Sequence, residues 1–128
     1  ILKIDLKDIF GTTLVGNNLK FISRFNLNEF DIIDLDAYGS PFNQLEIIFK
    51  KQYTGIVHCT FIQSILGSVN SKLLEEAGYP KKMYIKCPTL FSKNGMELMK
   101  LYLAKNKVKN IWYSGYSRKN YFYFHSDF

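Results

Sequence analysis

The chain has 128 residues, of which 47% are hydrophobic and 22% are charged, and its formal net charge is +6. This length allows one domain with its own core, and the composition excludes a globally disordered chain. No apolar run approaches the roughly 18 residues of a membrane helix, so the sequence predicts no membrane association. The basic excess favours a polyanionic partner such as RNA or DNA, although an A- and T-rich genome gives a similar composition.

The first third of the chain predicts the order strand, helix, strand. Residues 2–6 alternate and are rich in Leu and Ile, which is typical of a short strand. Residues 17–25 have apolar side chains at helical spacing, with Asn18 as the predicted N-cap. Residues 30–35 are densely apolar, which predicts a strand covered on both faces.

The middle of the chain continues this alternation. Pro41 precedes a predicted helix over residues 42–51 that ends in two lysines, and residues 55–61 predict a second central strand. Residues 61–79 predict a short helix, a turn and a second helix that ends at Gly78. Residues 80–91 contain two prolines and are interpreted as a connection.

The last third predicts a helix and a hairpin. Residues 95–106 form a strongly amphipathic pattern, and the aromatic runs on either side of Arg118-Lys119 are typical of two paired strands. Strands that alternate with helices favour one α/β domain over residues 1–128, with a mostly parallel sheet and one antiparallel strand added to its edge.

The stretch DLDAYGSP, residues 34–41, places two acids at the end of the predicted strand. Alternation turns Asp34 and Asp36 to the same side, and ligands of open α/β sheets bind at the carboxyl ends of the strands. Gly39 and Pro41 favour a tight turn into the next helix, which would hold an acid and the Tyr38 ring at the mouth of a crevice. The alternative is a plain strand-to-helix turn with an aspartate as helix cap.

The longer stretch FDIIDLDAYGSPF resembles motif IV of the class I methyltransferases that use S-adenosylmethionine. It is especially similar to the form DLDPFGSP of the tRNA guanine-N2 dimethyltransferase family, and it departs from that form at Ala37 and Tyr38. The order of the predicted elements, including the terminal strand pair, agrees with this family. The resemblance implies a Rossmann-like methyltransferase sheet, S-adenosylmethionine as cofactor, RNA as partner and methyl transfer to an exocyclic amine of a base.

The resemblance also implies roles for single residues. Asp36 takes the catalytic acid position, where a carboxylate can accept a hydrogen bond from the amine and stabilise charge that develops on nitrogen. Tyr38 takes the position that stacks on the base. The substrate side of the turn comprises Ala37, Gly39, Ser40 and Pro41.

Other candidate residues lie outside the turn. Gln63 follows the second central strand at the same end of the sheet, where it can either bond a base edge or be an ordinary polar residue. On the cofactor side the resemblance implies Asp34, together with Asp8 and the backbone of Ile9, and no metal is expected.

The glycine-rich loop that holds the cofactor in such enzymes is not present ahead of residue 34, because Gly11 and Gly16 lack the required pattern. The sequence therefore resembles the C-terminal part of a methyltransferase core without its first strands. A fragment, a chain with gaps and a subunit that needs a partner all remain open; the first residue, Ile1, favours a fragment. The alternatives to an RNA enzyme are a DNA amino-methyltransferase, disfavoured because Pro-Pro is absent from the motif, and a noncatalytic α/β module that binds nucleic acid or a partner.

The remaining reactive and aromatic residues have structural interpretations. Cys59 and Cys87 are predicted to be reduced core thiols of a cytoplasmic protein. His58 and Cys59 are adjacent on a strand and should face opposite sides, which argues against a nucleophile pair. The strand aromatics are expected to be core residues and cross-strand pairs rather than base-stacking residues: Trp112, Tyr113, Tyr116, Tyr121 and Tyr123.

Overall fold

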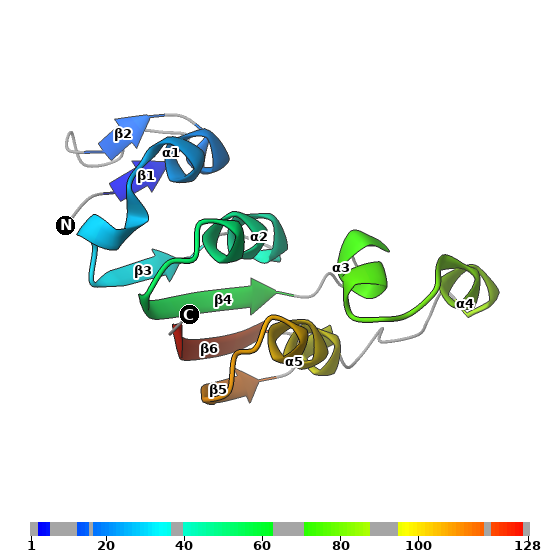
Figure 1. Cartoon of the computed structure of the whole chain (residues 1–128). Coiled ribbons are helices and arrows are strands. Elements are labelled where there is room, and N and C mark those ends of the chain that lie inside the picture. Colours follow the sequence, from blue (N-terminus) through cyan, green and yellow to red (C-terminus); the bar gives the residue numbers. More distant parts are fainter. Residues whose placement is uncertain are drawn as a thin grey trace.

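The structure is a computed structural model that describes residues 3–5, 13–15, 17–36, 40–62, 71–87, 95–116 and 119–126. Its described part is an α/β arrangement of a four-stranded mixed sheet, a separate two-stranded sheet and helices (Figure 1). The strands are β1 (Lys3–Asp5), β2 (Thr13–Val15), β3 (Ile32–Leu35), β4 (Gly55–Ile62), β5 (Ile111–Tyr116) and β6 (Lys119–Ser126). The helices are α1 (Asn18–Arg24), the 3-10 turn η1 (Leu27–Glu29), α2 (Phe42–Lys50), α3 (Ser71–Glu76), α4 (Lys81–Lys86) and α5 (Gly95–Lys105).

The main sheet has the strand order β3-β4-β6-β5. β3 and β4 are parallel, whereas β6 is antiparallel to both β4 and β5. The terminal hairpin is confirmed, but the prediction that its antiparallel strand lies at the sheet edge is wrong. β6 lies inside the sheet and β5, which runs in the same direction as β3 and β4, forms the edge. Three of the four strands, β3, β4 and β5, run in the same direction, as a mostly parallel sheet requires. However, only one of the three pairs of neighbouring strands is parallel, because β6 lies between β4 and β5.

The predicted strand at residues 2–6 is confirmed as β1, which pairs in parallel with β2. β2 was not predicted. It is three residues long, and its sequence TLV is too short for alternation to indicate a strand.

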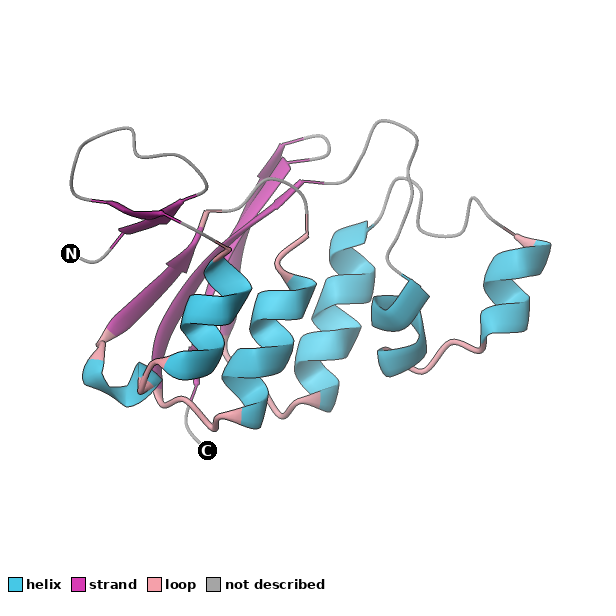
Figure 2. Ribbon diagram, turned by 90° about the horizontal axis from the view of Figure 1, so that it is seen from above, coloured by secondary structure: helices cyan, strands magenta, loops and turns pink. Residues whose placement is uncertain are grey.

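Three helices cover one face of the main sheet. Figure 2 shows α1, α2 and α5 side by side in front of the strands. The buried residues of α2 and α5 recur at helical spacing, as the sequence predicted: Phe42, Leu45, Ile48 and Phe49 on α2, and Met96, Met99, Tyr102 and Leu103 on α5. We refer to this side of the sheet as the covered face.

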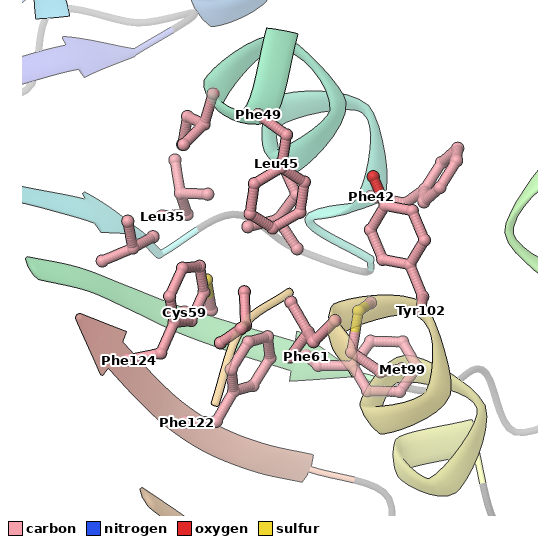
Figure 3. Packing of buried hydrophobic residues seen from close by; sticks show 14 of the residues in the cluster. Leu35, Phe42, Leu45, Phe49, Cys59, Phe61, Met99, Tyr102, Phe122 and Phe124 are labelled. Atoms are coloured by element: carbon pink, nitrogen blue, oxygen red, sulfur yellow. The ribbon is translucent and has the colours of Figure 1, made fainter. Parts of the chain in front are cut away.

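The core lies between these helices and the covered face (Figure 3). On β6 the fully buried Phe124 meets Phe49 of α2, with 6.0 Å between ring centroids. Tyr102 of α5 contacts Phe42 and Phe49, at 5.0 and 5.8 Å. These tilted aromatic contacts hold α2 and α5 against the same strands.

Capping residues fix where the helices begin and end. The cap of α1 is Asn17, whose side chain accepts a hydrogen bond from the Leu19 N–H at 2.9 Å, and not Asn18 as predicted. The Ser40 hydroxyl accepts from the Phe42 N–H at 3.3 Å at the start of α2. Gly78 has a φ of +99° just beyond α3, which confirms the predicted helix end.

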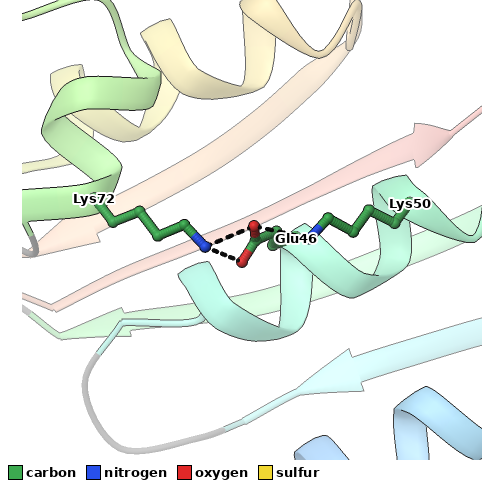
Figure 4. Close-up of polar contacts among 3 residues, drawn as sticks. All are labelled: Glu46, Lys50 and Lys72. Carbon is green, nitrogen blue, oxygen red and sulfur yellow. Dashed lines mark hydrogen bonds and ion pairs between the residues drawn. The ribbon is translucent and has the colours of Figure 1, made fainter.

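Polar contacts fasten the helices and the start of β4. Glu46 of α2 is held between Lys72 of α3, at 2.7 Å, and Lys50, at 3.1 Å (Figure 4). The buried Tyr53 hydroxyl donates to the Phe30 carbonyl at 3.0 Å. A Cβ on Gly55 would collide with that hydroxyl, which accounts for glycine at the first position of β4.

The segment predicted as a connection contains α4. Pro80 is the N-cap of this helix, and none of its six residues is buried. Pro80 therefore marks the start of a helix rather than a gap between elements.

Candidate functional site

The other side of the main sheet, which we call the open face, is not covered by any described helix. The prediction that the strand at residues 30–35 is covered on both faces is wrong, because Ile32 is 53% exposed and Asp34 is also exposed. Alternation sends every second side chain to this face. Its side chains include Ile32, Asp34, Asp36, His58, Thr60, Trp112, Ser114, Tyr121, Tyr123 and His125.

Two acids from β3 lie at one border of the open face. Asp34 pairs with His58 across the parallel ladder, and Asp36 follows the last residue of β3. Thr60 Oγ1 of β4 donates to Asp36 Oδ1 at 3.0 Å. The parallel register thus brings the carboxyl ends of two strands together, and the hydroxyl holds an exposed carboxylate in place.

Aromatic rings from the next strands continue this surface. Trp112 of β5 and Tyr123 of β6 stack at 5.1 Å with an angle of 11°, and His58 of β4 lies 5.4 Å from Tyr123. A groove of about 490 Å³ runs over the acids and these rings, and the residues that line it are Asp34, Asp36, His58, Cys59, Thr60, Trp112, Tyr113, Ser114, Tyr121, Phe122 and Tyr123. The expectation that the strand aromatics are core residues is therefore wrong for Trp112, Tyr121 and Tyr123, although the predicted cross-strand pairs are present.

Lys119 brings positive charge to the same end of the sheet. Its Nζ lies 5.1 Å from the centroid of the Tyr121 ring. The hydrogen bond with Tyr121 raises the pKa of Lys119, and the charge of Asp36 adds to this effect. Lys119 therefore remains a cation throughout the neutral range.

Tyr113 belongs to the other side of β5. It pairs with the buried Phe122, and Lys100 of α5 lies 3.7 Å from the centroid of its ring. Although 53% exposed, Tyr113 is thus held by a helix of the covered face. It was expected to be a core residue, which is wrong because β5 is the edge strand.

Several predicted site residues lie outside the described residues: Asp8, Ile9, Ala37, Tyr38, Gly39 and Gln63. Of the rest, the structure brings Asp34 and Asp36 to the open face, as alternation predicted. Ser40 and Pro41 lie at the start of α2, where Ser40 bonds the helix backbone and Pro41 is buried. These contacts give Ser40 and Pro41 a structural role in the turn.

The two cysteines differ. Cys59 is buried on the covered face, whereas His58 is exposed on the open face, so the prediction that they point apart is confirmed. Burial raises the pKa of the Cys59 thiol, and the Asp34 charge adds to this. Cys87 is exposed directly after α4, so its assignment as a core thiol is wrong. Neither thiol takes part in a disulfide.

Sequence reasoning missed Thr60 and the aromatic surface. The sequence of β6 does indicate the aromatic surface, because Tyr121 and Tyr123 alternate with Phe122 and Phe124. Rings that carry a hydroxyl group at every second position indicate a side of the strand that faces solvent. Thr60 carried no signal in the sequence, since its role follows from the register of β3 and β4.

Comparisons with known proteins do not assign this chain to a family. No protein-family model matches the chain, nor does any curated protein or solved structure. Among the described residues, no three His, Cys, Asp or Glu side chains are grouped as a metal ion would require. None of the described helices has the length and apolar character of a membrane span.

Proposed function

We propose that this chain takes part in methyl transfer from S-adenosylmethionine to an exocyclic amine of a nucleic-acid base, with RNA favoured over DNA. The observation that carries the proposal is the Asp36 carboxylate, exposed at the carboxyl end of β3 and held by Thr60 from the neighbouring parallel strand. The resemblance assigns the catalytic acid to this position.

The strand order adds support from outside the motif. The resemblance implies a sheet that ends in an antiparallel terminal pair, and the described sheet has such a pair in β5 and β6. Helices α1, α2 and α5 then lie in the connections that precede β3, β4 and β5. This arrangement favours a methyltransferase-like sheet over a plain dinucleotide-binding domain.

Asp36 would act on the acceptor amine. With Oδ1 held by Thr60, the carboxylate can accept an amine N–H and orient the nitrogen lone pair toward an incoming methyl group. The same negative charge would stabilise the positive charge that develops on nitrogen as the new N–C bond forms and the bond between the methyl group and the cofactor sulfur breaks. The proton that the amine then loses passes to Asp36 or to water.

The cofactor would supply the methyl group, and the described residues alone do not form a pocket for it. Of the residues that the resemblance places beside the cofactor, the structure describes only Asp34, whose carboxylate lies on the open face beside His58. A single exposed carboxylate is too little to hold a nucleoside and an amino acid. The roles argued here therefore concern the acceptor side alone.

The test is a methyl-transfer assay with labelled S-adenosylmethionine and unpaired RNA, followed by mass spectrometry of the nucleosides. We expect Asp36→Asn to lower transfer by about 100-fold, since it removes the charge that stabilises the developing cation. Asp31→Asn is the matched control, because Asp31 is exposed at the opposite end of the same strand. It should transfer like the unmodified chain.

Calorimetry with S-adenosylmethionine separates binding from transfer. Cofactor binding that persists in Asp36→Asn while transfer is lost supports the acceptor role. Equal transfer by Asp36→Asn and Asp31→Asn would refute it. A folded chain that neither binds the cofactor nor transfers methyl groups favours the alternative, a noncatalytic α/β module that binds nucleic acid or a partner.

A further inference from the structure

The aromatic rings of the open face form a platform that the acceptor role of Asp36 does not explain. His58, Tyr123 and Trp112 make a continuous row across three strands, with centroid distances of 5.4 and 5.1 Å. Tyr121 lies two residues before Tyr123 on the same side of β6, and Lys119 accompanies it. The three larger rings are 43–50% exposed, although burial of aromatic rings is favourable.

We propose that this platform binds an unpaired stretch of RNA whose bases stack on Tyr121, Tyr123 and Trp112. The proposal rests on the proposed function, because it names the surface that holds the substrate strand near Asp36. Aromatic side chains on a sheet suit single strands, since every base offers a flat face and none has to be read by sequence.

The chemistry of the platform favours RNA over a covering protein segment. A sheet face that packs against helices is rich in Val, Ile and Leu. Here the strands β6 and β5 instead present rings with polar edges, together with Ser114 and Lys119. The isoleucines of this face, Ile32, Ile56 and Ile62, lie on β3 and β4. The net charge of +6 also complements a polyanion.

The charges across the face set the orientation of the strand. Asp34 and Asp36 border the groove on β3, whereas Lys119 lies on β6. Phosphates should therefore follow the β6–β5 side and bases should point toward β3, where Asp36 can accept an amine. This orientation predicts tighter binding of oligocytidine than of oligouridine, which has a carbonyl in place of the amine.

The only tryptophan of the chain, Trp112, lies on this platform and provides the probe. We expect single-stranded oligocytidine to quench its fluorescence in the full 128-residue chain, more strongly than a duplex of equal length. Tyr123→Ala should weaken binding by about five-fold or more, the lower end of the loss for one stacked base. Tyr121→Ala, a second variant on the other cross-strand row, should also weaken it.

Tyr113→Ala is the matched control. Tyr113 has the same ring, lies on the neighbouring strand and is similarly exposed, at 53% against 43% for Tyr123. The residue borders the groove, but it pairs with the buried Phe122, and its ring lies under Lys100 on the covered side. Binding by this variant should equal that of the unmodified chain. Circular dichroism of each variant checks that it folds.

Three results would overturn the platform. One is no quenching at about 100 μM oligocytidine, the weak limit of nonspecific binding. Another is equal binding by the Tyr113, Tyr121 and Tyr123 variants, which would place RNA elsewhere. The third is Trp112 fluorescence that changes with protein concentration alone, together with a dimer in sedimentation, which would assign the face to a second copy.

The same variants separate this inference from the proposed activity. RNA that binds in a Tyr123-dependent way but is never methylated would support the platform and refute the activity. Methyl transfer that is unchanged in Tyr121→Ala and Tyr123→Ala would support the activity and refute the platform.

Discussion

The two faces of the main sheet are built from alternate residues of the same strands, yet they have opposite character. On β6 the residues Phe122, Phe124 and Ser126 are buried under helices, whereas their neighbours Tyr121 and Tyr123 are exposed. The covered face holds the core, and the open face carries the acids, the rings and the groove. One set of side chains on β6 thus packs in the core and stabilises the fold, and the other set is exposed and available for binding.

The two faces should differ most in how far the loss of one aromatic ring lowers the free energy of unfolding. Phe124→Ala should lower the free energy of unfolding by about 3–5 kcal/mol, because Phe124 is fully buried against Phe49. Tyr123→Ala, one residue away, should lower it by about 1 kcal/mol or less, since 43% of Tyr123 is exposed. Urea unfolding measures both, and equal losses would mean that the open face is as buried as the covered one.

The next largest expected effect is a loss of folding stability at alkaline pH, which originates in groups of the covered face. Burial raises the pKa of the Cys59 thiol and, with the charges of Glu46 and Glu76, that of the Tyr102 phenol, from ordinary values of 9.0 and 10.0. Above those values the unfolded chain has released protons that the folded chain still binds, so the free energy of unfolding falls as pH rises.

The expected loss is about 3 kcal/mol by about pH 10.5, measured as urea midpoints from neutral pH upward. Cys59→Ala should flatten the part of the decline that begins near pH 9, whatever its effect on the starting stability. A midpoint that is constant to pH 10.5, or a slope unchanged in the variant, would contradict this origin.

The hydroxyl groups of Ser126 and Thr60 allow the same comparison of the two faces for hydrogen bonds. Ser126 Oγ donates to the Tyr53 carbonyl at 2.7 Å inside the protein, so Ser126→Ala should cost about 1–2 kcal/mol by leaving a buried acceptor unpaired. Thr60→Val removes the bond to Asp36, but water can solvate that exposed carboxylate, and the cost should be about 0.5 kcal/mol or less. Methyl transfer should respond in the opposite order, falling several-fold in Thr60→Val and little in Ser126→Ala.

An effect of similarly small size concerns the surface of the helical layer. Hydrogen bonds from Lys72 and then Lys50 lower the pKa of Glu46 below its usual 4.5. The stabilisation is therefore present above pH 4.5 and is lost as pH falls through the lower folded value. Glu46→Gln should cost about 0.5 kcal/mol at pH 7 and nothing near pH 3. A cost that persists at pH 3 would assign the effect to packing instead of charge.

Local patterns predicted most of the elements of the fold, because helical spacing in α2 and α5 and aromatic runs in β5 and β6 are properties of contiguous residues. The place of β6 inside the sheet was not predictable in this way, since both hairpin strands are aromatic and tertiary packing decides which one pairs with β4. α4 was missed because Pro80 was interpreted as a breaker, although proline at a helix start is common.

The candidate site was predicted in part. Alternation from Leu35 sufficed to place Asp34 and Asp36 on one side. The open face was not foreseen, because the apolar run FDIIDL matches a strand buried on both sides, whereas the side chain of Ile32 is left outside. Thr60 depends on register between strands 20 residues or more apart in sequence, which no local pattern contains.

The central claim, that function belongs to the open face and stability to the covered face, is tested most directly by ultraviolet crosslinking of unpaired RNA to the chain with mass spectrometric mapping of the joined residues. We predict crosslinks at Trp112, Tyr121 and Tyr123, and a lower yield with duplex RNA. Crosslinks confined to the helical layer, at residues of α1, α2 or α5, would contradict the claim.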